Sequence, residues 1–338
     1  MPYVIQELLL IKGGKMKKLS VKSILPCIVC LFVLLTGCSK KDATGKSRKT
    51  IAFITNNTAD FWIIAQRGCE KAQTELPDYA IDFRLTSDAT PAEQRRIIDD
   101  LLARGVAGIA ISPIDPINQK PFIDTLAEQI TVITCDSDIP DSKRLCYIGT
   151  DNVAAGRQAG QLIKEVLPEG GKIMLFVGKR DVQNAKERIQ GIEEVLEGTN
   201  VEIIDVRTDN TDQVQAKSNV ADALVKYPDL ACCVGLWSYN GPAILNAVSD
   251  AGKLGKVRIV TFDEESETLA GVRDGYIYGT VVQQPFEFGH QSMKVLAKII
   301  EGDKSMIPAD GQMIVPTLII KKDDAPAFIE KMKKLLGK

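Results

Sequence analysis

The chain has 338 residues, of which 45% are hydrophobic and 25% charged, with 42 Lys and Arg against 44 Asp and Glu. This length suits two lobes of ordinary size, each with its own core, better than one domain. The balanced charge offers no basic excess for a phosphate backbone, so we expect no nucleic-acid partner.

The first 38 residues differ from the rest of the chain. Lysines precede an apolar run at 24–35, and Leu35-Thr36-Gly37-Cys38 follows. The run has about a dozen residues, short of the ~20 that a spanning helix needs, and its end resembles the lipobox of bacterial lipoproteins. We therefore expect a signal peptide over 1–38 with Cys38 lipidated, rather than an ordinary membrane anchor or a buried helix. Met1 and Met16 both remain open as the start.

The segment 39–49 is polar and rich in lysine, which predicts a flexible tether. Outside the signal, no cysteines have the C-x-x-C spacing of a zinc site, so we expect buried thiols and no metal. The body cysteines are Cys69, Cys135, Cys146, Cys232 and Cys233. A disulfide between Cys135 and Cys146 remains open, because an exported protein meets an oxidising compartment.

From residue 50 onward, short β-branched runs alternate with amphipathic stretches of helical period. This alternation predicts an α/β fold with parallel strands and crossover helices. The predicted strands are 50–55, 80–85, 107–111, 131–135, 172–177, 201–206, 231–236, 257–261 and 278–282. The predicted helices are 60–75, 91–103, 118–128, 153–167, 184–197, 212–226, 241–250, 265–273 and 286–300.

The alternation breaks once, at 136–152, where a polar loop leads into a short strand, 146–150, with no helix before it. We expect the boundary between the two lobes there. Each half then has its own set of strands, although no residue-level repeat is visible.

Polar and aromatic side chains follow most of the predicted strands, at the edge where open α/β sheets bind their ligands. They are Asn56 to Trp62, Asp136 to Asp138, Asn184 with Arg188, Asp209 to Asp212, Trp237 to Asn240, Asp263 with Glu264, and Gln283 with Gln284. Carboxylates, amides, an arginine and flat rings are the groups that a sugar pocket needs. Singly, each is as well explained as a helix cap, a surface ion pair or a core aromatic. Together, they favour a pocket.

At these residues the chain resembles the periplasmic binding proteins of the ribose-binding type, over roughly residues 49–320. The resemblance rests on Ile51 to Ile54 with Phe61-Trp62, Val132 to Asp136, Ile148 to Asn152, Asn184 to Gly191, Val260 to Asp263 and Thr280 to Pro285. It implies two similar doubly wound parallel-sheet lobes of the type I fold. They would be joined by crossovers near 150–152, 282–285 and 313–317. The N-terminal lobe would comprise 50–150 with 285–313, and the C-terminal lobe 151–283 with 315–338.

Carried over residue by residue, the resemblance implies stacking rings, hydroxyl-binding carboxylates, an arginine and a hinge glutamine. These fall on Phe61 and Trp62, Asp136 and Asp263, Arg188, and Gln283. Ala59 stands where the family usually has a pocket asparagine, so Asn57 or Asp60 is expected to compensate. Ser137 replaces an arginine of the ribose binder, and Trp237 is expected as a further ring wall. These departures indicate a ligand that differs from ribose in stereochemistry or size.

The resemblance implies a monomeric binding protein, and the lipobox predicts that it is lipid-anchored in the cell envelope, facing the periplasm or the outside. It would capture a monosaccharide-like ligand for an ABC-type permease; presentation of a sugar signal to a membrane sensor is the alternative. We expect no catalysis and no cofactor, because His290 is the only histidine and no nucleophile or phosphate-loop motif is present. A repressor core, which shares this fold, would need a DNA-binding headpiece before residue 50.

Overall fold

A computed structural model of the chain describes residues 48–337, and from residue 49 onward the chain forms one compact unit. The signal peptide, Cys38 and nearly all of the tether fall outside the described residues, so these expectations remain predictions. Between residues 48 and 337, no helix combines the length and apolar character that a membrane span requires.

The first sheet has the strand order β11-β5-β4-β3-β1-β2, and all neighbouring strands in it are parallel. Its strands are β1 (Lys49–Ile54), β2 (Tyr79–Arg84), β3 (Gly108–Ile111), β4 (Thr131–Cys135), β5 (Tyr147–Gly149) and β11 (Gln312–Ile314). We call this sheet and the helices packed on it the N-terminal lobe.

The second sheet has the order β12-β10-β9-β8-β6-β7, the same pattern of positions as in the first. Its strands are β6 (Gly171–Val177), β7 (Val201–Thr208), β8 (Leu230–Gly235), β9 (Arg258–Phe262), β10 (Gly279–Val282) and β12 (Leu318–Lys321). Only the β10–β12 pair in it is antiparallel. This sheet and its helices form the C-terminal lobe.

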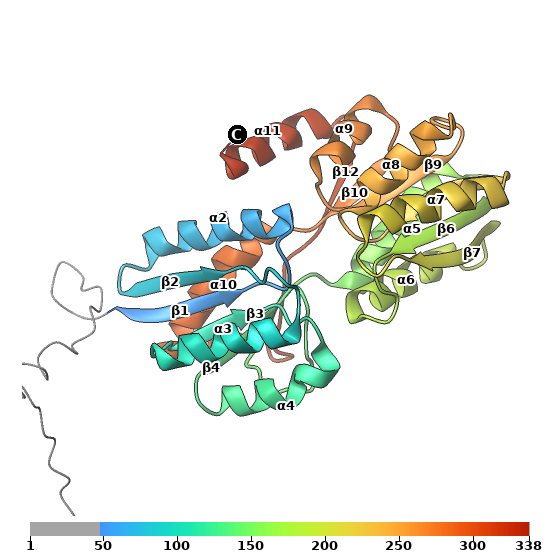
Figure 1. Cartoon of the computed structure of the whole chain (residues 1–338). Coiled ribbons are helices and arrows are strands. Elements are labelled where there is room, and N and C mark those ends of the chain that lie inside the picture. The colour runs from blue at the N-terminus through green and yellow to red at the C-terminus, as the bar shows by residue number, and fades with distance from the viewer. Residues whose placement is uncertain (1–47, 338) are drawn as a thin grey trace, which may run out of the picture. The chain divides into compact units, whose positions relative to one another are not determined.

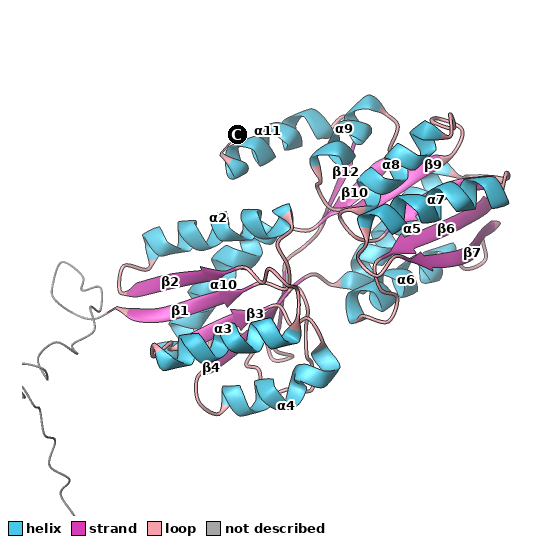
Figure 2. Ribbon diagram, viewed as in Figure 1, coloured by secondary structure: helices cyan, strands magenta, loops and turns pink. Residues whose placement is uncertain are grey.

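Helices cover both faces of each sheet (Figure 2). In the N-terminal lobe they are α2 (Asp60–Glu75) and α10 (Pro285–Ile300) on one face, and α3 (Pro91–Ala103) and α4 (Pro116–Ala127) on the other. In the C-terminal lobe α5 (Asn152–Val166) and α6 (Gln183–Leu196) share one face. The opposite face packs against α7 (Gln213–Lys226), α8 (Asn240–Asp250), α9 (Ser266–Asp274) and α11 (Ala325–Leu336).

The apolar runs form central strands because both faces of each strand are buried. In β1, Ile51 and Phe53 enter the core under α2 and α10, whereas Ala52 and Ile54 enter the core under α3 and α4. All four are fully buried. Strands enclosed in this way read as continuous apolar runs, which is the pattern of the sequence.

The chain passes between the sheets three times: after β5, after β10, and between β11 and β12 (Figure 1). This confirms the predicted fold of two α/β lobes and three crossovers. The sequence-based list of elements missed β11, β12 and α11. The body cysteines are all buried free thiols, so Cys135 and Cys146 are not joined.

Two close contacts determine where α2 lies. It crosses α10 at glycines: a Cβ on Gly68 would lie 1.9 Å from the Phe286 carbonyl oxygen, and a Cβ on Gly289 would lie 2.0 Å from that of Ala65. On another side, α2 contacts α11, the last helix of the C-terminal lobe. There Ile64, which is 3% exposed, packs into the C-terminal lobe's core cluster together with Met332.

Candidate functional site

Asp136 lies at the carboxyl end of β4 and joins the ends of three neighbouring strands. Its Oδ2 accepts a hydrogen bond from Ser112 Oγ (3.0 Å), which follows β3, and from Asn56 Nδ2 (3.4 Å), which follows β1. Asn56 Nδ2 also donates to Ser112 Oγ (3.0 Å). The sheet order β4-β3-β1 therefore creates this polar cluster from residues far apart in the sequence.

Asp263 occupies the equivalent place in the C-terminal lobe, after β9. Its Oδ1 accepts a hydrogen bond from Gln283 Nε2 (3.0 Å), and the residue is 4% exposed. Its backbone N–H donates to Val281 on the next strand (2.9 Å), as that of Asp136 donates to Ile148 (3.0 Å). The two aspartates thus hold corresponding positions in the two sheets.

The two aspartates also share an uncommon backbone conformation. Their φ angles are +63° for Asp136 and +65° for Asp263, in the left-handed region. Such conformations cost free energy in non-glycine residues and cluster at functional sites. In each lobe a hydroxyl from the adjacent strand donates to the aspartate's carbonyl oxygen: Tyr147 to Asp136 (3.1 Å) and Thr280 to Asp263 (2.8 Å). Both strained turns are therefore held by the neighbouring strand.

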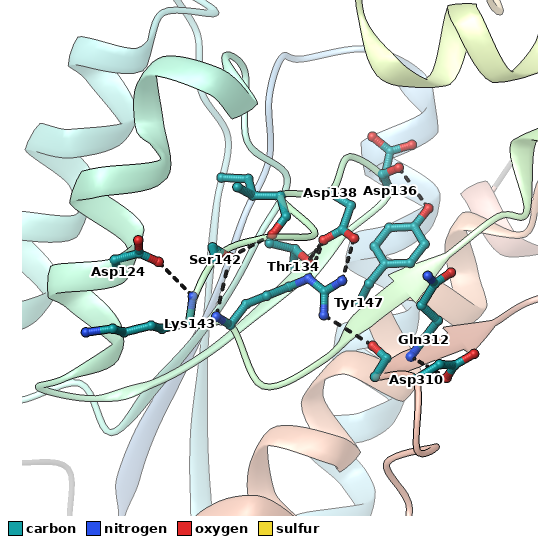
Figure 3. Close-up of polar contacts among 12 residues, drawn as sticks. Asp124, Thr134, Asp136, Asp138, Ser142, Lys143, Tyr147, Asp310 and Gln312 are labelled. Carbon is teal, nitrogen blue, oxygen red and sulfur yellow. Dashed lines mark hydrogen bonds and ion pairs between the residues drawn. The ribbon is translucent and has the colours of Figure 1, made fainter.

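The loop after Asp136 is held by a largely buried ion pair of Asp138 (Figure 3). Arg144 donates to both carboxylate oxygens of Asp138, at 2.5 and 2.6 Å, and Thr134 Oγ1 donates to the same carboxylate (2.5 Å). Bidentate geometry makes this one of the stronger kinds of ion pair. It fixes the chain directly after Asp136.

Arg188, on α6, is almost fully buried, with 2% of its surface exposed. Its Nε donates to Asn152 Oδ1 (3.0 Å), its Nη1 donates to the Leu236 carbonyl (2.6 Å), and its guanidinium lies 4.4 Å from the centre of the Phe262 ring. These contacts leave its planar cation fixed at the strand ends of the C-terminal lobe.

The charges of the two lobes influence one another. Burial raises the pKa of Asp136 to about 6, with the Ser112 hydrogen bond and the Arg188 charge opposing the shift and the Asp263 charge adding to it. Burial also raises the pKa of Asp263, against the lowering effect of Arg188. One arginine therefore acts on carboxylates from both sheets.

Gln283 connects the first two crossovers. Its Nε2 donates to Asp263, and its Oε1 accepts a hydrogen bond from Thr150 Oγ1 (3.0 Å) at the end of β5. Gln283 therefore links the Asp263 carboxylate to the first two crossovers between the lobes.

The two adjacent aromatics at the start of α2 have different surroundings. Phe61 is half-buried and meets Trp62 edge to face, with ring centres 4.9 Å apart. Trp62 is 1% exposed, and its Nε1 donates to Asn56 Oδ1 (3.0 Å). Stacking of Trp62 on a ligand remains a prediction, and the structure shows its ring packed in the core of the N-terminal lobe.

The remaining predicted residues lie at the same strand ends. Asn57 donates to Asn56 Oδ1 (2.7 Å) and accepts a bond from the Ala59 N–H (2.8 Å), which shapes the turn into α2. Asp60 is exposed at the first residue of that helix. Trp237 is half-buried after β8, with its ring 6.3 Å from that of Tyr239.

The set predicted from sequence omitted several polar residues of this region. Asn56 was noted as a residue after a strand but not chosen, and Ser112, which directly follows the third predicted strand, was not considered. Glu264, beside Asp263, is buried, and its carboxyl has no hydrogen-bond partner among residues 48–337. Burial and the Asp263 charge raise its pKa well above the ordinary range.

The chain resembles several known proteins in sequence and in structure. The ribose import binding protein RbsB of Escherichia coli K12 is 25% identical over 278 residues, covering 81% of this chain and 93% of that protein. A solute-binding protein of an ABC transporter from Burkholderia graminis, solved in complex with D-arabinose, is 27% identical with a TM-score of 0.77, covering 82% and 96%. GanP, a glucose-galactose binding protein from Geobacillus stearothermophilus, is 26% identical with a TM-score of 0.78, covering 83% and 100%.

The family model described as a periplasmic binding protein domain matches residues 51–304. This span begins in β1, ends beyond α10, and includes both aspartates, Arg188 and Gln283. The chain therefore belongs to the periplasmic binding protein family.

Proposed function

We propose that this protein captures a monosaccharide-like ligand between the strand ends of its two lobes and delivers it to an ABC-type permease. The observation that carries the proposal is the pair Asp136 and Asp263. They occupy equivalent places in two sheets, with the same left-handed backbone. A carboxylate accepts hydrogen bonds from two neighbouring hydroxyls, which suits a polyol ring better than an apolar or anionic ligand.

The other groups fit the same ligand. Arg188 donates to ring or hydroxyl oxygens, and the half-buried faces of Phe61 and Trp237 suit the C–H faces of a sugar ring. Trp62 supports this site from behind, by holding Asn56, and Asn57 shapes the adjoining turn. Relatives solved with sugar ligands, among them the D-arabinose complex, support this class of ligand.

The proposed mechanism is closure of the lobes on the ligand. A sugar held by one aspartate gains contacts with the other lobe only when the lobes come together, so it favours the closed arrangement. Each desolvated hydroxyl must find a partner, because an unpaired buried polar group costs ~1–3 kcal/mol. This requirement lets such a pocket reject epimers. The protein would bind its ligand without transforming it.

The cellular setting follows from the same family. Its members act in the periplasm or outside the cell, and we propose that this one is a monomer anchored there through lipidated Cys38. Metabolic labelling with a palmitate analogue tests the anchor: Cys38→Ser should abolish labelling. Labelling that survives this substitution would contradict the proposed site.

Thermal unfolding of the purified full chain tests the ligand class, with pentoses, hexoses, deoxysugars and polyols at millimolar concentration. A ligand at 100 times its dissociation constant stabilises by ~2.7 kcal/mol, so the midpoint should rise by several degrees. Asp136→Ala should abolish the rise. Asp141→Ala, an exposed aspartate of the same loop, should keep it. If no sugar raises the midpoint, the proposal of a sugar ligand is wrong.

A further inference from the structure

Asp209, at the end of β7, is a buried carboxylate held entirely by uncharged donors. It is 2% exposed and accepts hydrogen bonds from the Tyr239 hydroxyl (2.6 Å), Asn240 Nδ2 (3.2 Å) and the Thr211 N–H (2.9 Å). Within the described residues, none of its hydrogen bonds comes from Lys or Arg. Burying a carboxylate costs free energy, and the hydrogen bonds from these donors must offset that cost, which requires a specific arrangement of the partners.

The carboxylate determines which way the Asn240 amide faces. An ionised carboxylate only accepts hydrogen bonds, so Asn240 must turn its NH₂ group toward Asp209. Its carbonyl oxygen then faces the backbone N–H of Trp237 and accepts that hydrogen bond (3.0 Å). Asp209 thus fixes the backbone of Trp237 through one intermediate residue.

Asp209 also acts on the Trp237 ring through Tyr239. The tyrosine hydroxyl is anchored on the carboxylate, and its ring meets the Trp237 ring at 75°. The indole also lies close to backbone: a Cβ on Gly178 would lie 2.1 Å from Trp237 Cζ3. The ring is therefore restrained by Tyr239 and by the backbone at Gly178, as well as through its own backbone.

We propose that Asp209 and Asn240 are positioning residues that orient Trp237 as a wall of the ligand site and thereby set selectivity among sugars. This rests on the proposed function, since Trp237 is taken to contact the ligand. Neither residue needs to touch the sugar. Their role is to keep the indole in the one orientation that matches the preferred ring.

The hydrogen-bond pattern makes the proposal testable by an exchange of two residues. In Asp209→Asn, the new NH₂ group faces the NH₂ group of Asn240, and turning either amide breaks another bond of the network. In Asn240→Asp, two carboxylates face each other. In the double variant, the new amide at position 209 donates to the new carboxylate at position 240. That carboxylate still accepts from Trp237, and the carbonyl oxygen of the new amide still accepts from Tyr239 and Thr211. All four hydrogen bonds are restored.

The experiment measures affinity for the best sugar of the panel and for its epimers, using the full chain well below its unfolding midpoint. Each single variant should bind the preferred sugar about tenfold more weakly and discriminate less between epimers, the effect of losing one charge-assisted bond. The double variant should return to within about threefold of the original protein. Asp212→Asn, an exposed helix cap in the same loop, should change nothing.

Near-UV circular dichroism without ligand separates this proposal from the proposed function. The chain has two tryptophans, so the Trp237 contribution is prominent. The indole bands should change in both single variants and return in the double. If the original protein binds no sugar, the proposed function fails while the spectra still test the positioning. Unchanged spectra and selectivity in Asp209→Asn, or a double variant no better than the singles, would overturn the inference.

Discussion

Asp136 and Asp263 face one arginine from two lobes, but their immediate partners differ. Asp136 is bonded by a hydroxyl and an amide of its own lobe, whereas Asp263 is bonded by the hinge glutamine. A ligand bound to both would therefore contact Asp136, which is held within its own lobe, and Asp263, which is linked to the crossovers through Gln283. This difference makes Asp136 the better reporter of binding, because its side-chain hydrogen-bond partners belong to its own lobe.

Ligand affinity should fall as the pH drops through about 6. The pKa of Asp136 is raised to about 6, so the carboxylate that accepts sugar hydroxyls is protonated below that pH. If only the ionised form binds, the dissociation constant at pH 5 should be about tenfold larger than at pH 7. Isothermal titration calorimetry at both pH values measures the ratio.

Folding stability should respond in the opposite direction. A carboxyl whose pKa is raised on folding holds its proton more tightly in the native state, so its contribution to stability declines as the pH rises from about 4 to 6.

The control for the binding prediction is Asp136→Asn, whose side chain cannot ionise. This variant should bind the ligand more weakly, and it should lose most of the change in dissociation constant between pH 5 and pH 7. A step of unchanged size in this variant would assign the titration to another group.

At the level of single residues, the sequence predicted as site residues those polar residues that directly follow an apolar run. Asp136, Asp263 and Gln283 each follow an apolar run directly. In the structure Gln283 donates to Asp263 and the Arg188 charge acts on both aspartates, while the role of these residues in binding remains a prediction. Ser112 and Asn56 join Asp136 only because β3 lies between β4 and β1 in the sheet. Strand order is a property of long-range pairing, so this cluster could not be found from local patterns.

Strand β5 supports the site through one hydroxyl. Tyr147 Oη donates to the Asp136 carbonyl oxygen (Figure 3), and the same hydroxyl lies within hydrogen-bond distance of the Thr150 carbonyl oxygen, each at 3.1 Å. The ring is buried, and a Cβ on Gly149 would lie 2.1 Å from that hydroxyl. One short strand thus holds the strained turn of Asp136 and the start of the first crossover.

Tyr147→Phe should lower the free energy of unfolding by about 1–3 kcal/mol, because the carbonyls of Asp136 and Thr150 lose the hydroxyl that they share. It should also weaken ligand binding, since the Asp136 turn loses its support. Chemical denaturation measures the first effect and calorimetry the second. Tyr278→Phe, in which the hydroxyl bonds an exposed Glu165, should change stability by less than about 0.5 kcal/mol. Equal effects of the two variants would contradict the supporting role.

The helices and strands up to α10 were predicted more completely than β11, β12 and α11. Long β-branched runs and helical periods place the strands and helices up to Ile300 within a few residues of their observed bounds. The short strands β11 and β12 are only partly buried and carry little pattern. The α11 helix had a usable signal, since Phe328, Ile329, Met332 and Leu336 recur at helical spacing.

The α11 helix belongs to one lobe and packs against a helix of the other. It belongs to the C-terminal lobe's core cluster, yet it contacts α2, on which Phe61 also lies. Ile64, one turn after Phe61, is buried in that contact. Any movement of the lobes that separates α11 from α2 must expose Ile64, so the contact favours the arrangement described here.

Ile64→Ala should lower the free energy of unfolding by about 2–4 kcal/mol, as expected for a buried aliphatic side chain replaced by a methyl group. Chemical denaturation of the full chain measures the loss. Ile117→Ala supplies the matched control, because Ile117 is 81% exposed and its loss should cost less than about 0.5 kcal/mol. If Ile64→Ala behaves like Ile117→Ala, the contact between α2 and α11 does not contribute to stability.

The three crossovers also impose an order on biosynthesis. The N-terminal lobe takes β1 to β5 from the first part of the chain, but α10 and β11 come from 285–314. While the ribosome is still translating the C-terminal lobe, Trp62, Cys69 and Ile133 lack the cover that Phe288 and Leu296 provide in the finished core. The nascent N-terminal lobe therefore exposes apolar surface until nearly the whole chain has emerged. Apolar surface exposed in an incomplete chain is prone to aggregation, which is the condition that chaperones relieve.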